Sequence, residues 1–480
     1  MSDFDPQGFA TTLATIGVVI IVASLLSGPL ERRAFPPVAI FLLLGLAIGP
    51  SGLGLLDVGL QSPALAIIAT LSLTLVLFTD ALGIDGIGIR QNLRLSLLVL
   101  GPGTLVTTAL VAGAAWWLLD LPAPMAAILG AALASTDPVM MRGLLRRPGV
   151  PKTARIALGV ESGLNDAVVL PVVLVAITIL GPTPPSAKAI GLVGLNVFLL
   201  GPAVGAFIGY LAVRSLELIR HRFGMRRDYE SLYVLGVAFA AFAAAESMHA
   251  SGFMAAFAAG LTVTLLDIEL CDCFHDYGEA TSEMFLLFAF VALGTSLIWT
   301  GLDVVTAPTL AFAAIALLAR SGVLWIALRG RVDADSAPYV IWFGPRALSS
   351  LLLVLLPVFA GVSEATQLFP VTALVVLFSV AIHGAMLMSW NKRLGEPVAA
   401  GPTGDDRALV PSGELITFDQ YRGLVQHRVG VRLLDVRSNS SYSGADLQAA
   451  GAVRVTPDRP EESAAALALP KNDWLVAYCA

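Results

Sequence analysis

Long apolar runs separated by short polar stretches dominate the first 395 residues of the chain. A helix needs about 20 apolar residues to cross the hydrocarbon of a bilayer, and on that criterion the sequence predicts thirteen spans. Their centres lie near Val18, Leu43, Leu71, Leu105, Ile128, Val168, Val204, Ala238, Ala256, Phe288, Leu317, Leu352 and Leu377. The pattern predicts an all-α polytopic membrane domain over residues 1–395.

The pattern changes after the last apolar run. Residues 396–410 contain Gly-Pro-Thr-Gly and are typical of a linker. In residues 411–480, Val431–Arg437 and Trp474–Cys479 predict strands, and Tyr442–Val455 predicts a polar helix or loop before a third, short strand. Strands that alternate with polar segments indicate a small α/β segment.

Composition agrees with this division. The chain is 56% hydrophobic and 13% charged, whereas a soluble domain carries about 25% charged residues. No basic arm or aromatic-interleaved basic patch indicates nucleic acid. Three cysteines, Cys271, Cys273 and Cys479, are too few for a disulfide framework. The first apolar run has no basic region before it, so we do not interpret it as a signal peptide.

Loop charge predicts the orientation, because basic residues concentrate on the cytoplasmic side. One set of alternate loops carries almost all the Lys and Arg, including the cluster from Arg142 to Arg155, and the other set carries only Lys188. We therefore expect the N-terminus outside and the C-terminal tail in the cytoplasm. A bacterial plasma (inner) membrane is the expected location.

A few ionisable residues interrupt the apolar spans, and such residues are functional candidates because burial in lipid is costly. They are Asp80 in the third span, Asp137 in the fifth, Glu161 and Asp166 in the sixth, Arg320 in the eleventh and Arg346 in the twelfth. Asp80 lies near a boundary, and Arg320 fits a structural role with a lipid headgroup or a backbone carbonyl.

Helix geometry separates the polar residues of the sixth span into two faces. Glu161 and Asn165 are four residues apart and share one face, while Ser162 and Asp166 share the next. The Ser162 hydroxyl and the Asp166 carboxylate should therefore look into one cavity. Glu161 needs a partner elsewhere, and Arg346 is the natural one because an unpaired guanidinium would be equally costly.

Proline should break two spans. Pro138 follows Thr136 and Asp137, and Pro345 follows Gly344. Proline removes a backbone donor and clashes with the preceding turn, so carbonyls such as that of Thr136 should be freed. Paired broken helices in two halves of a sequence indicate a transporter site.

These residues suit a small monovalent cation. Hard cations take oxygen ligands, and one carboxylate with neutral oxygens fits a single positive charge. Asp166, Ser162 and the Thr136 carbonyl supply that set. A buried carboxylate can hold a proton or a cation but not both, and this competition with alternating access would be an antiport mechanism.

The sequence resembles the monovalent cation:proton antiporter superfamily, in the sodium/proton exchanger branch that carries Asn-Asp in its sixth helix. The resemblance covers residues 10–395. Its motifs are Thr136-Asp137-Pro138, Glu161-Ser162-x-x-Asn165-Asp166, Gly252-Phe253-Met254-Ala255-Ala256-Phe257-x-Ala259-Gly260 and Gly344-Pro345-Arg346-Ala347-Leu348-Ser349.

The resemblance implies a homodimer with inverted repeats, two broken crossing helices and elevator-like alternating access. It implies that Asp166 binds the cation and the proton with Ser162 and Thr136 as ligands, and that Asp137 faces the crossing. Asn165 would stabilise the crossing, Glu161 would pair with Arg346, and Asp80 would lie beside the cation path. The Asn-Asp pair implies electroneutral exchange of Na⁺ or Li⁺ for H⁺, with no resident cofactor and a role in pH homeostasis.

The tail resembles the first part of a rhodanese domain, on Leu434-Asp435-Val436-Arg437, Gly451-Ala452 and the strand that ends at Cys479. In that family the cysteine opens an active loop, and here the sequence ends at Ala480. We therefore expect a secondary transporter and no sulfurtransferase activity. The alternatives are a potassium/proton antiporter, a membrane-anchored sulfurtransferase and a sensor whose tail reports ion occupancy.

Overall fold

The computed structural model describes residues 36–394 except 85–91, 146, 148, 182–185, 224–226 and 267–271. In the tail it describes 431–437, 448–449, 451–456 and 474–478, and elsewhere a few single positions. The chain forms two compact units, Met1–Val398 and Ala399–Ala480. The predicted linker, 396–410, and Cys479 lie outside the described residues.

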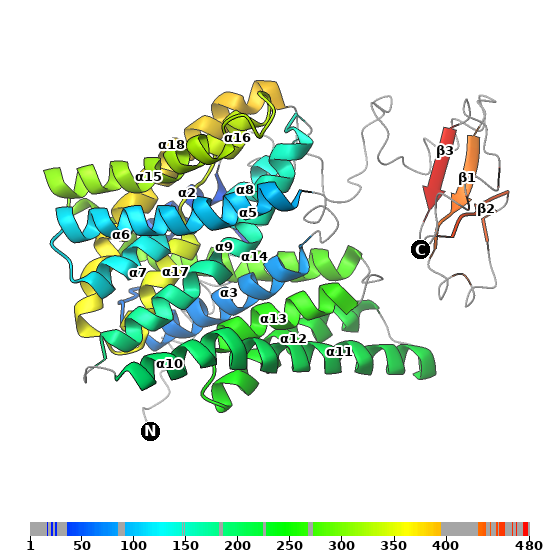
Figure 1. Cartoon of the computed structure of the whole chain (residues 1–480), viewed down its shortest axis with the longest axis horizontal. Helices are drawn as coiled ribbons and strands as arrows, with labels where there is room; N and C mark the ends of the chain where they lie inside the picture. Colours follow the sequence, from blue (N-terminus) through cyan, green and yellow to red (C-terminus); the bar gives the residue numbers. More distant parts are fainter. Residues whose placement is uncertain are drawn as a thin grey trace. The chain divides into compact units, whose positions relative to one another are not determined.

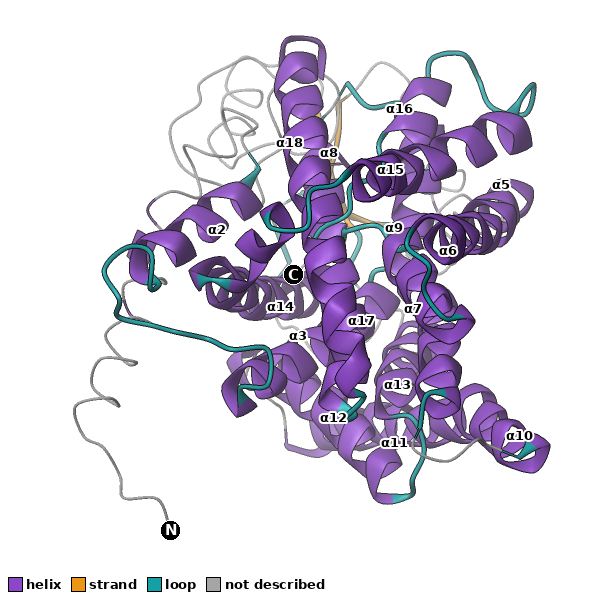
Figure 2. Cartoon of the chain, turned by 90° about the vertical axis from the view of Figure 1, so that its left-hand side faces the viewer, coloured by secondary structure: helices purple, strands orange, loops and turns teal. Residues whose placement is uncertain are grey.

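The described part of the first unit is helical, and most of its long helices lie side by side along a common direction (Figures 1 and 2). In chain order the elements are α2 (Pro37–Ile48), α3 (Pro63–Leu82), α5 (Leu93–Leu98), the π-helix η1 (Val99–Val106), α6 (Thr107–Leu118), α7 (Ala123–Ala134), α8 (Pro138–Leu145), α9 (Lys152–Ile179), α10 (Ala187–Leu195), the π-helix η2 (Asn196–Leu200), α11 (Gly201–Phe223), α12 (Arg227–Ser247), α13 (Gly252–Leu266), α14 (Asp272–Thr295), the 3₁₀-helix η3 (Leu297–Leu302), α15 (Ala307–Leu328), α16 (Ala337–Trp342), α17 (Leu348–Phe359), the 3₁₀-helix η4 (Ser363–Gln367) and α18 (Leu368–Leu394).

Within the described residues, seven helical stretches are long and apolar enough to cross a membrane, and five shorter helices are also apolar. The predicted span centres from Leu43 to Leu377 all lie in these helices. The centre near Val18 lies outside the described residues, so the predicted number of thirteen is not confirmed. The predicted multi-pass membrane architecture is confirmed.

Both predicted helix breaks are present. α7 ends at Ala134 and α8 starts at Pro138, while α16 ends at Trp342 and α17 starts at Leu348. Ser135 and Phe343, the first residues after α7 and α16, have extended backbone, and a proline, which cannot donate to the helical ladder, lies at each break. The two breaks meet directly, because the Asp137 N–H donates to the Pro345 carbonyl at 2.9 Å.

Small residues allow neighbouring helices of this unit to approach closely. A Cβ on Gly205 of α11 would lie 2.0 Å from the Ala255 carbonyl oxygen of α13. A Cβ on Gly260 of α13 would lie 2.4 Å from the Phe78 carbonyl oxygen of α3. Helix association in lipid relies on such backbone contact because water does not drive it.

The second unit contains a three-stranded parallel sheet in the order β2-β1-β3, made of β1 (Val431–Asp435), β2 (Val453–Arg454) and β3 (Trp474–Tyr478). The three strands lie within the segments predicted as strands. Asp435 ends β1 and is fully buried. It accepts hydrogen bonds from the Arg437 guanidinium at 2.6 and 2.9 Å and from the Tyr478 hydroxyl at 2.9 Å. These bonds, mainly that from Arg437, lower the pKa of Asp435 to about 2.

Candidate ion-binding site

The polar face of α9 is buried at the level of the two helix breaks. Glu161, Asn165 and Asp166 are 3%, 0% and 2% exposed, so three groups that water would normally solvate lie inside the protein. Burial of this kind requires partners on the neighbouring helices, and those partners define the site.

Asp166 lies between the end of α7 and the start of α17. The Ser135 hydroxyl donates to Asp166 Oδ1, and the Ser349 side chain lies close to the same carboxylate. Oδ2 is buried and makes no hydrogen bond within the part of the chain that the structure describes. A buried carboxylate oxygen in this condition is costly, so Oδ2 is the atom best placed to take a proton or a cation.

The hydroxyls of Ser162 and Thr136 make other hydrogen bonds, and the predicted roles of Ser162 and the Thr136 carbonyl as cation ligands stay predictions. The Ser162 hydroxyl donates to the Gly159 carbonyl of its own helix at 3.3 Å, and the Thr136 hydroxyl accepts from the Asn165 amide at 2.6 Å. The hydroxyls that reach Asp166 come instead from Ser135 and Ser349. Ser135 directly precedes the Thr136-Asp137-Pro138 motif, which is the signal that could have identified it.

Asn165 links α9 to the first break. Its amide nitrogen donates to Thr136, and its buried carbonyl oxygen Oδ1 makes no hydrogen bond among the described residues. Asn165 therefore fixes the extended segment that carries both Ser135 and Thr136 beside Asp166.

Asp137 caps two half-helices at once. Its Oδ1 accepts from the Met140 N–H at 3.0 Å, in the first turn of α8, and its Oδ2 accepts from the Leu348 N–H at 3.0 Å, where α17 starts. Helix N-termini carry partial positive charge and free N–H groups. Asp137 therefore holds the crossing, whereas its predicted part in ion binding stays a prediction.

Arg346 provides the complementary contact at the negative end of α7. Its guanidinium donates to the Ser135 carbonyl at 3.0 Å, and its backbone N–H donates to the Ser379 hydroxyl at 2.6 Å. The crossing thus places a carboxylate at two helix N-termini and a guanidinium at a helix C-terminus, which is the favourable arrangement at each.

The predicted Glu161–Arg346 pair is wrong. Glu161 forms a two-point ion pair with Arg320 of α15, through Nε to Oε1 and Nη2 to Oε2. The Arg320 guanidinium also donates to the carbonyls of Ile341 and Val340, at 3.2 and 3.0 Å, near the end of α16. Arg346 is occupied by the Ser135 carbonyl, so the carboxylate pairs with the other buried arginine.

Gly344 leaves room for this ion pair. A Cβ at residue 344 would lie 2.7 Å from the guanidinium carbon of Arg320. Glycine at the second break is therefore required by the approach of an arginine side chain.

Asp80 lies near the C-terminal end of α3, beside α9. A Cβ on Gly163 would lie 3.5 Å from the Asp80 carbonyl oxygen. Gly163 is three residues before Asp166, about one helical turn away. Asp80 is thus close to the site in the fold, whereas its part in a cation path stays a prediction.

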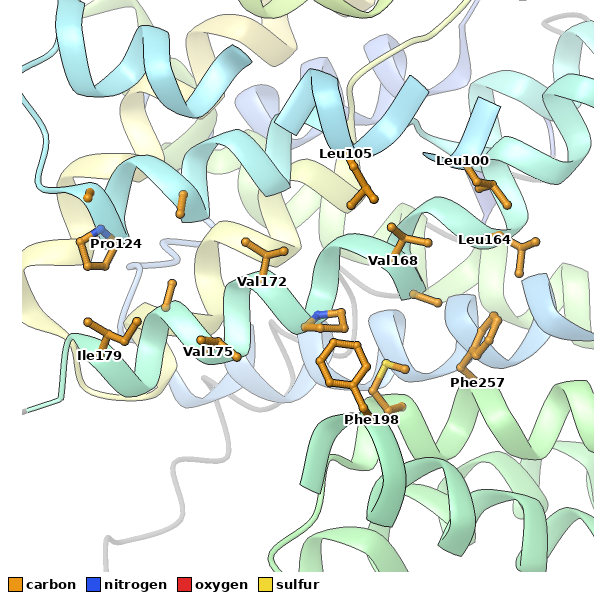
Figure 3. A pocket seen from close by; sticks show the side chains of 16 residues that line it. Leu100, Leu105, Pro124, Leu164, Val168, Val172, Val175, Ile179, Phe198 and Phe257 are labelled. Carbon is orange, nitrogen blue, oxygen red and sulfur yellow. The ribbon is translucent and has the colours of Figure 1, made fainter. Parts of the chain in front are cut away.

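The opposite face of α9 lines an apolar cavity of about 920 Å³ (Figure 3). Leu164, Ala167, Val168, Pro171, Val172, Val175, Ala176 and Ile179 lie on its wall. This stripe covers four helical turns, or about 22 Å. The remaining wall comes from η1, α7, η2 and α13, all with apolar side chains. α9 therefore separates a polar site from a wholly apolar surface.

Comparison with known proteins decides the family. The family model described as "Sodium/hydrogen exchanger, transmembrane" matches residues 16–391. The chain belongs to this family. The predicted superfamily is thereby confirmed, and the family and fold are those of a transporter rather than of an enzyme.

Curated relatives of this exchanger differ in the cation that they are named for. The chain is 26% identical over 402 residues to a K(+)/H(+) antiporter NhaP of Alkalimonas amylolytica, covering 82% of this chain and 68% of the relative. It is 26% identical to a K(+)/H(+) antiporter NhaP2 of Shewanella baltica, covering 78% and 65%. It is 27% identical to a Na(+)/H(+) antiporter NhaG of Bacillus atrophaeus, covering 68% and 64%. The chain thus spans about two thirds of each relative's length.

A solved structure supports the fold. The sodium proton antiporter MjNhaP1 of Methanocaldococcus jannaschii superposes with a TM-score of 0.63 at 20% identity, covering 80% of this chain and 97% of that one. At this identity the likeness concerns the arrangement of helices.

Proposed function

We propose that this exchanger moves a monovalent cation against H⁺, with both ions competing for Asp166. The observation that carries the proposal is the buried Oδ2 oxygen of Asp166, which makes no hydrogen bond within the described residues. The Asp166 carboxylate lies beside the side chains of Ser135, directly after α7, and Ser349 of α17, which belong to the two broken helices.

The residues around Asp166 account for the competition. The Ser135 hydroxyl holds Oδ1, so the carboxylate keeps one orientation whichever ion occupies Oδ2. A proton removes the negative charge that a cation needs, and a cation removes the lone pair that a proton needs. Hard cations favour carboxylate, hydroxyl and carbonyl oxygens, and Ser349 and the freed backbone of the break offer these.

Na⁺ or Li⁺ is the proposed cation, and K⁺ is the alternative. The MjNhaP1 fold and the relative named NhaG favour the first, while the relatives named NhaP and NhaP2 favour the second. Acridine-orange dequenching in everted vesicles, with Na⁺, Li⁺ and K⁺ added in turn, separates the two.

The further features of the proposal come from the sequence. They are a homodimer in the plasma membrane, an external N-terminus, a cytoplasmic tail and elevator-like alternating access. A rhodanese-like tail is proposed as an accessory segment, on the resemblance of Leu434-Asp435-Val436-Arg437 and Gly451-Ala452. A thiosulfate:cyanide assay of the purified protein tests the alternative of a membrane-anchored sulfurtransferase, and we expect no activity in it.

Asp166→Asn is the decisive variant. It keeps the size of the side chain and removes the negative charge, so cation-driven proton flux should fall to the background of empty vesicles. Asp303→Asn, the same change at an exposed residue, should leave the flux unchanged. Thermal unfolding and size-exclusion profiles should match the unmodified protein in both variants. Residual exchange in Asp166→Asn would remove Asp166 from the site.

Electroneutral exchange is a separate expectation that follows from the Asn165–Asp166 pair. One titrating carboxylate exchanges one proton for one monovalent cation, so no net charge moves. The rate in proteoliposomes should not change when a membrane potential of either sign is imposed. A rate that rises with one sign and falls with the other would contradict it.

A further inference from the structure

A buried histidine on α18 faces the second helix break. His383 is 6% exposed, and its ring packs edge-on against Phe343, the first residue after α16, with centroids 5.8 Å apart. None of the contacts described so far at Asp166 uses this side chain. Its imidazole is nevertheless joined to the ion site by an unbroken series of polar contacts.

The first contact is with Ser379, one turn earlier on α18. Nδ1 of His383 lies 2.9 Å from the Ser379 carbonyl oxygen and 3.2 Å from Ser379 Oγ. A carbonyl oxygen can only accept, so Nδ1 carries the proton and donates. The same Nδ1 also contacts the Ser379 hydroxyl oxygen, so the ring fixes the position of that oxygen.

The second contact joins Ser379 to the break. Ser379 Oγ accepts from the backbone N–H of Arg346 at 2.6 Å. Arg346 lies outside α16 and α17, so no helical carbonyl satisfies this buried donor, and a buried N–H without a partner is costly. The serine hydroxyl therefore determines where the backbone of residue 346 lies.

The remaining contacts reach the carboxylate. The Arg346 guanidinium donates to the Ser135 carbonyl at 3.0 Å, and the Ser135 hydroxyl donates to Asp166. A displacement of Arg346 would therefore displace Ser135, the residue that orients Asp166.

We propose that His383 and Ser379 form a positioning pair that sets the second helix break and, through Arg346 and Ser135, the geometry of the ion site. The pair does not touch the cation. It rests on the proposed function, because the property that it tunes is cation affinity at Asp166.

The test separates positioning from simple stability. His383→Ala, Ser379→Ala and His383→Asn are compared with the unmodified exchanger in proteoliposomes, with Na⁺ and K⁺ each tested as the driving cation. Asparagine can place an N–H near the position of Nδ1, whereas alanine cannot. Ser389→Ala is the matched control, because the Ser389 hydroxyl is exposed on the same helix and, among the described residues, donates to the Met386 carbonyl alone.

The apparent KM for the cation should rise about three- to tenfold in both alanine variants, the scale of one lost hydrogen bond. In His383→Asn the apparent KM should lie within about twofold of the unmodified value, because asparagine keeps the hydrogen bond to Ser379. Ser389→Ala should not change it. Ser379→Ala removes a single oxygen atom and disturbs the packing little. Its KM therefore tests the proposal even if His383→Ala folds poorly.

Two results would overturn the proposal. One is an unchanged KM in Ser379→Ala with a maximal rate that falls only in proportion to folded protein. The other is an asparagine variant as impaired as the alanine variant. Failure of the proposed function would look different, because the unmodified protein would then show no exchange with either cation.

Discussion

At the scale of single residues, Ser135 emerges as the direct partner of Asp166. Its hydroxyl binds the carboxylate, and its carbonyl receives Arg346. One residue at the end of α7 thus joins the ion site to the second broken helix. The Ser135 hydroxyl contacts α9, whereas the Ser135 carbonyl oxygen contacts Arg346 before α17. Removing the hydroxyl should therefore affect Asp166 and leave the contact with Arg346 in place.

Ser135→Ala should lower cation affinity without unfolding the protein. Hydrogen bonds to charged groups contribute about 1.5–3 kcal/mol, so the apparent KM should rise at least about tenfold. Ser350→Ala is the control, since the Ser350 hydroxyl is equally buried and makes no hydrogen bond within the described residues. Equal KM values for the two variants would show that Ser135 does not orient Asp166.

The sequence alone predicts Asp166 as the candidate ion-binding carboxylate, but it does not predict all of its hydrogen-bond partners. A carboxylate in an apolar helix stands out in any sequence, and proline marks the breaks. The i, i+4 rule favoured Ser162, whose hydroxyl turns back to Gly159. Contacts inside one helix can be predicted from the spacing of residues in the sequence. The approach of Ser135 and Ser349 to Asp166 depends on how the two broken helices cross, and residue spacing carries no information about that crossing.

At the scale of elements, the buried ion pair between Glu161 and Arg320 holds α9, α15 and α16 together. The carboxylate lies on α9, the guanidinium on α15, and that guanidinium also bonds carbonyls at the end of α16. Both arginines could be recognised as buried from the sequence, but the choice between them depends on packing. Gly344 contributes to it, because a Cβ at residue 344 would lie 2.7 Å from the Arg320 guanidinium.

Removing one partner of this pair should destabilise the protein strongly. Arg320→Ala leaves a buried carboxylate without its ion pair, which costs about 3–5 kcal/mol. Thermal unfolding in detergent measures this loss, and Arg329→Ala, at an exposed site after the same helix, should show little change. A double variant, Glu161→Gln with Arg320→Met, should be more stable than Arg320→Ala alone. Equal stability of the two would exclude the pair as the cause.

At the scale of the whole molecule, the chain has two compact units with different chemistry. The first is an apolar helical unit in which the buried charges of Asp137, Asp166 and Arg346 lie at the crossing of two broken helices. The second is a small parallel sheet in which Asp435 is surrounded by Arg437, Arg454 and Tyr478. Composition changes along the sequence as well, since charge is scarce before residue 396 and ordinary after it.

The second unit should lose stability in acid. The pKa of Asp435 is lowered to about 2, from an unfolded value of about 3.9. A lowered pKa means that ionised Asp435 stabilises the sheet above about pH 4 and that this contribution disappears as the pH falls towards about 2. Hydrogen exchange of peptides from β1 and β3 should therefore be faster in Asp435→Asn than in the unmodified chain at pH 6.

The same comparison near pH 2 provides the control. Protonated Asp435 and asparagine are both uncharged, so the difference in exchange between the two proteins should shrink there. A difference that persists unchanged would show that the charge is not what stabilises the sheet.

The two faces of α9 have unequal consequences for motion. On the polar side, hydrogen bonds to Ser135 and Thr136 and an ion pair to Arg320 connect the helix to the end of α7 and to α15, so separating these elements would break those contacts. On the other side, a four-turn apolar stripe faces η1, α7, η2 and α13 across a cavity without a single polar lining residue. Displacement along η2 and α13 would therefore break no hydrogen bond across that surface, and friction there would be set by side-chain shape alone.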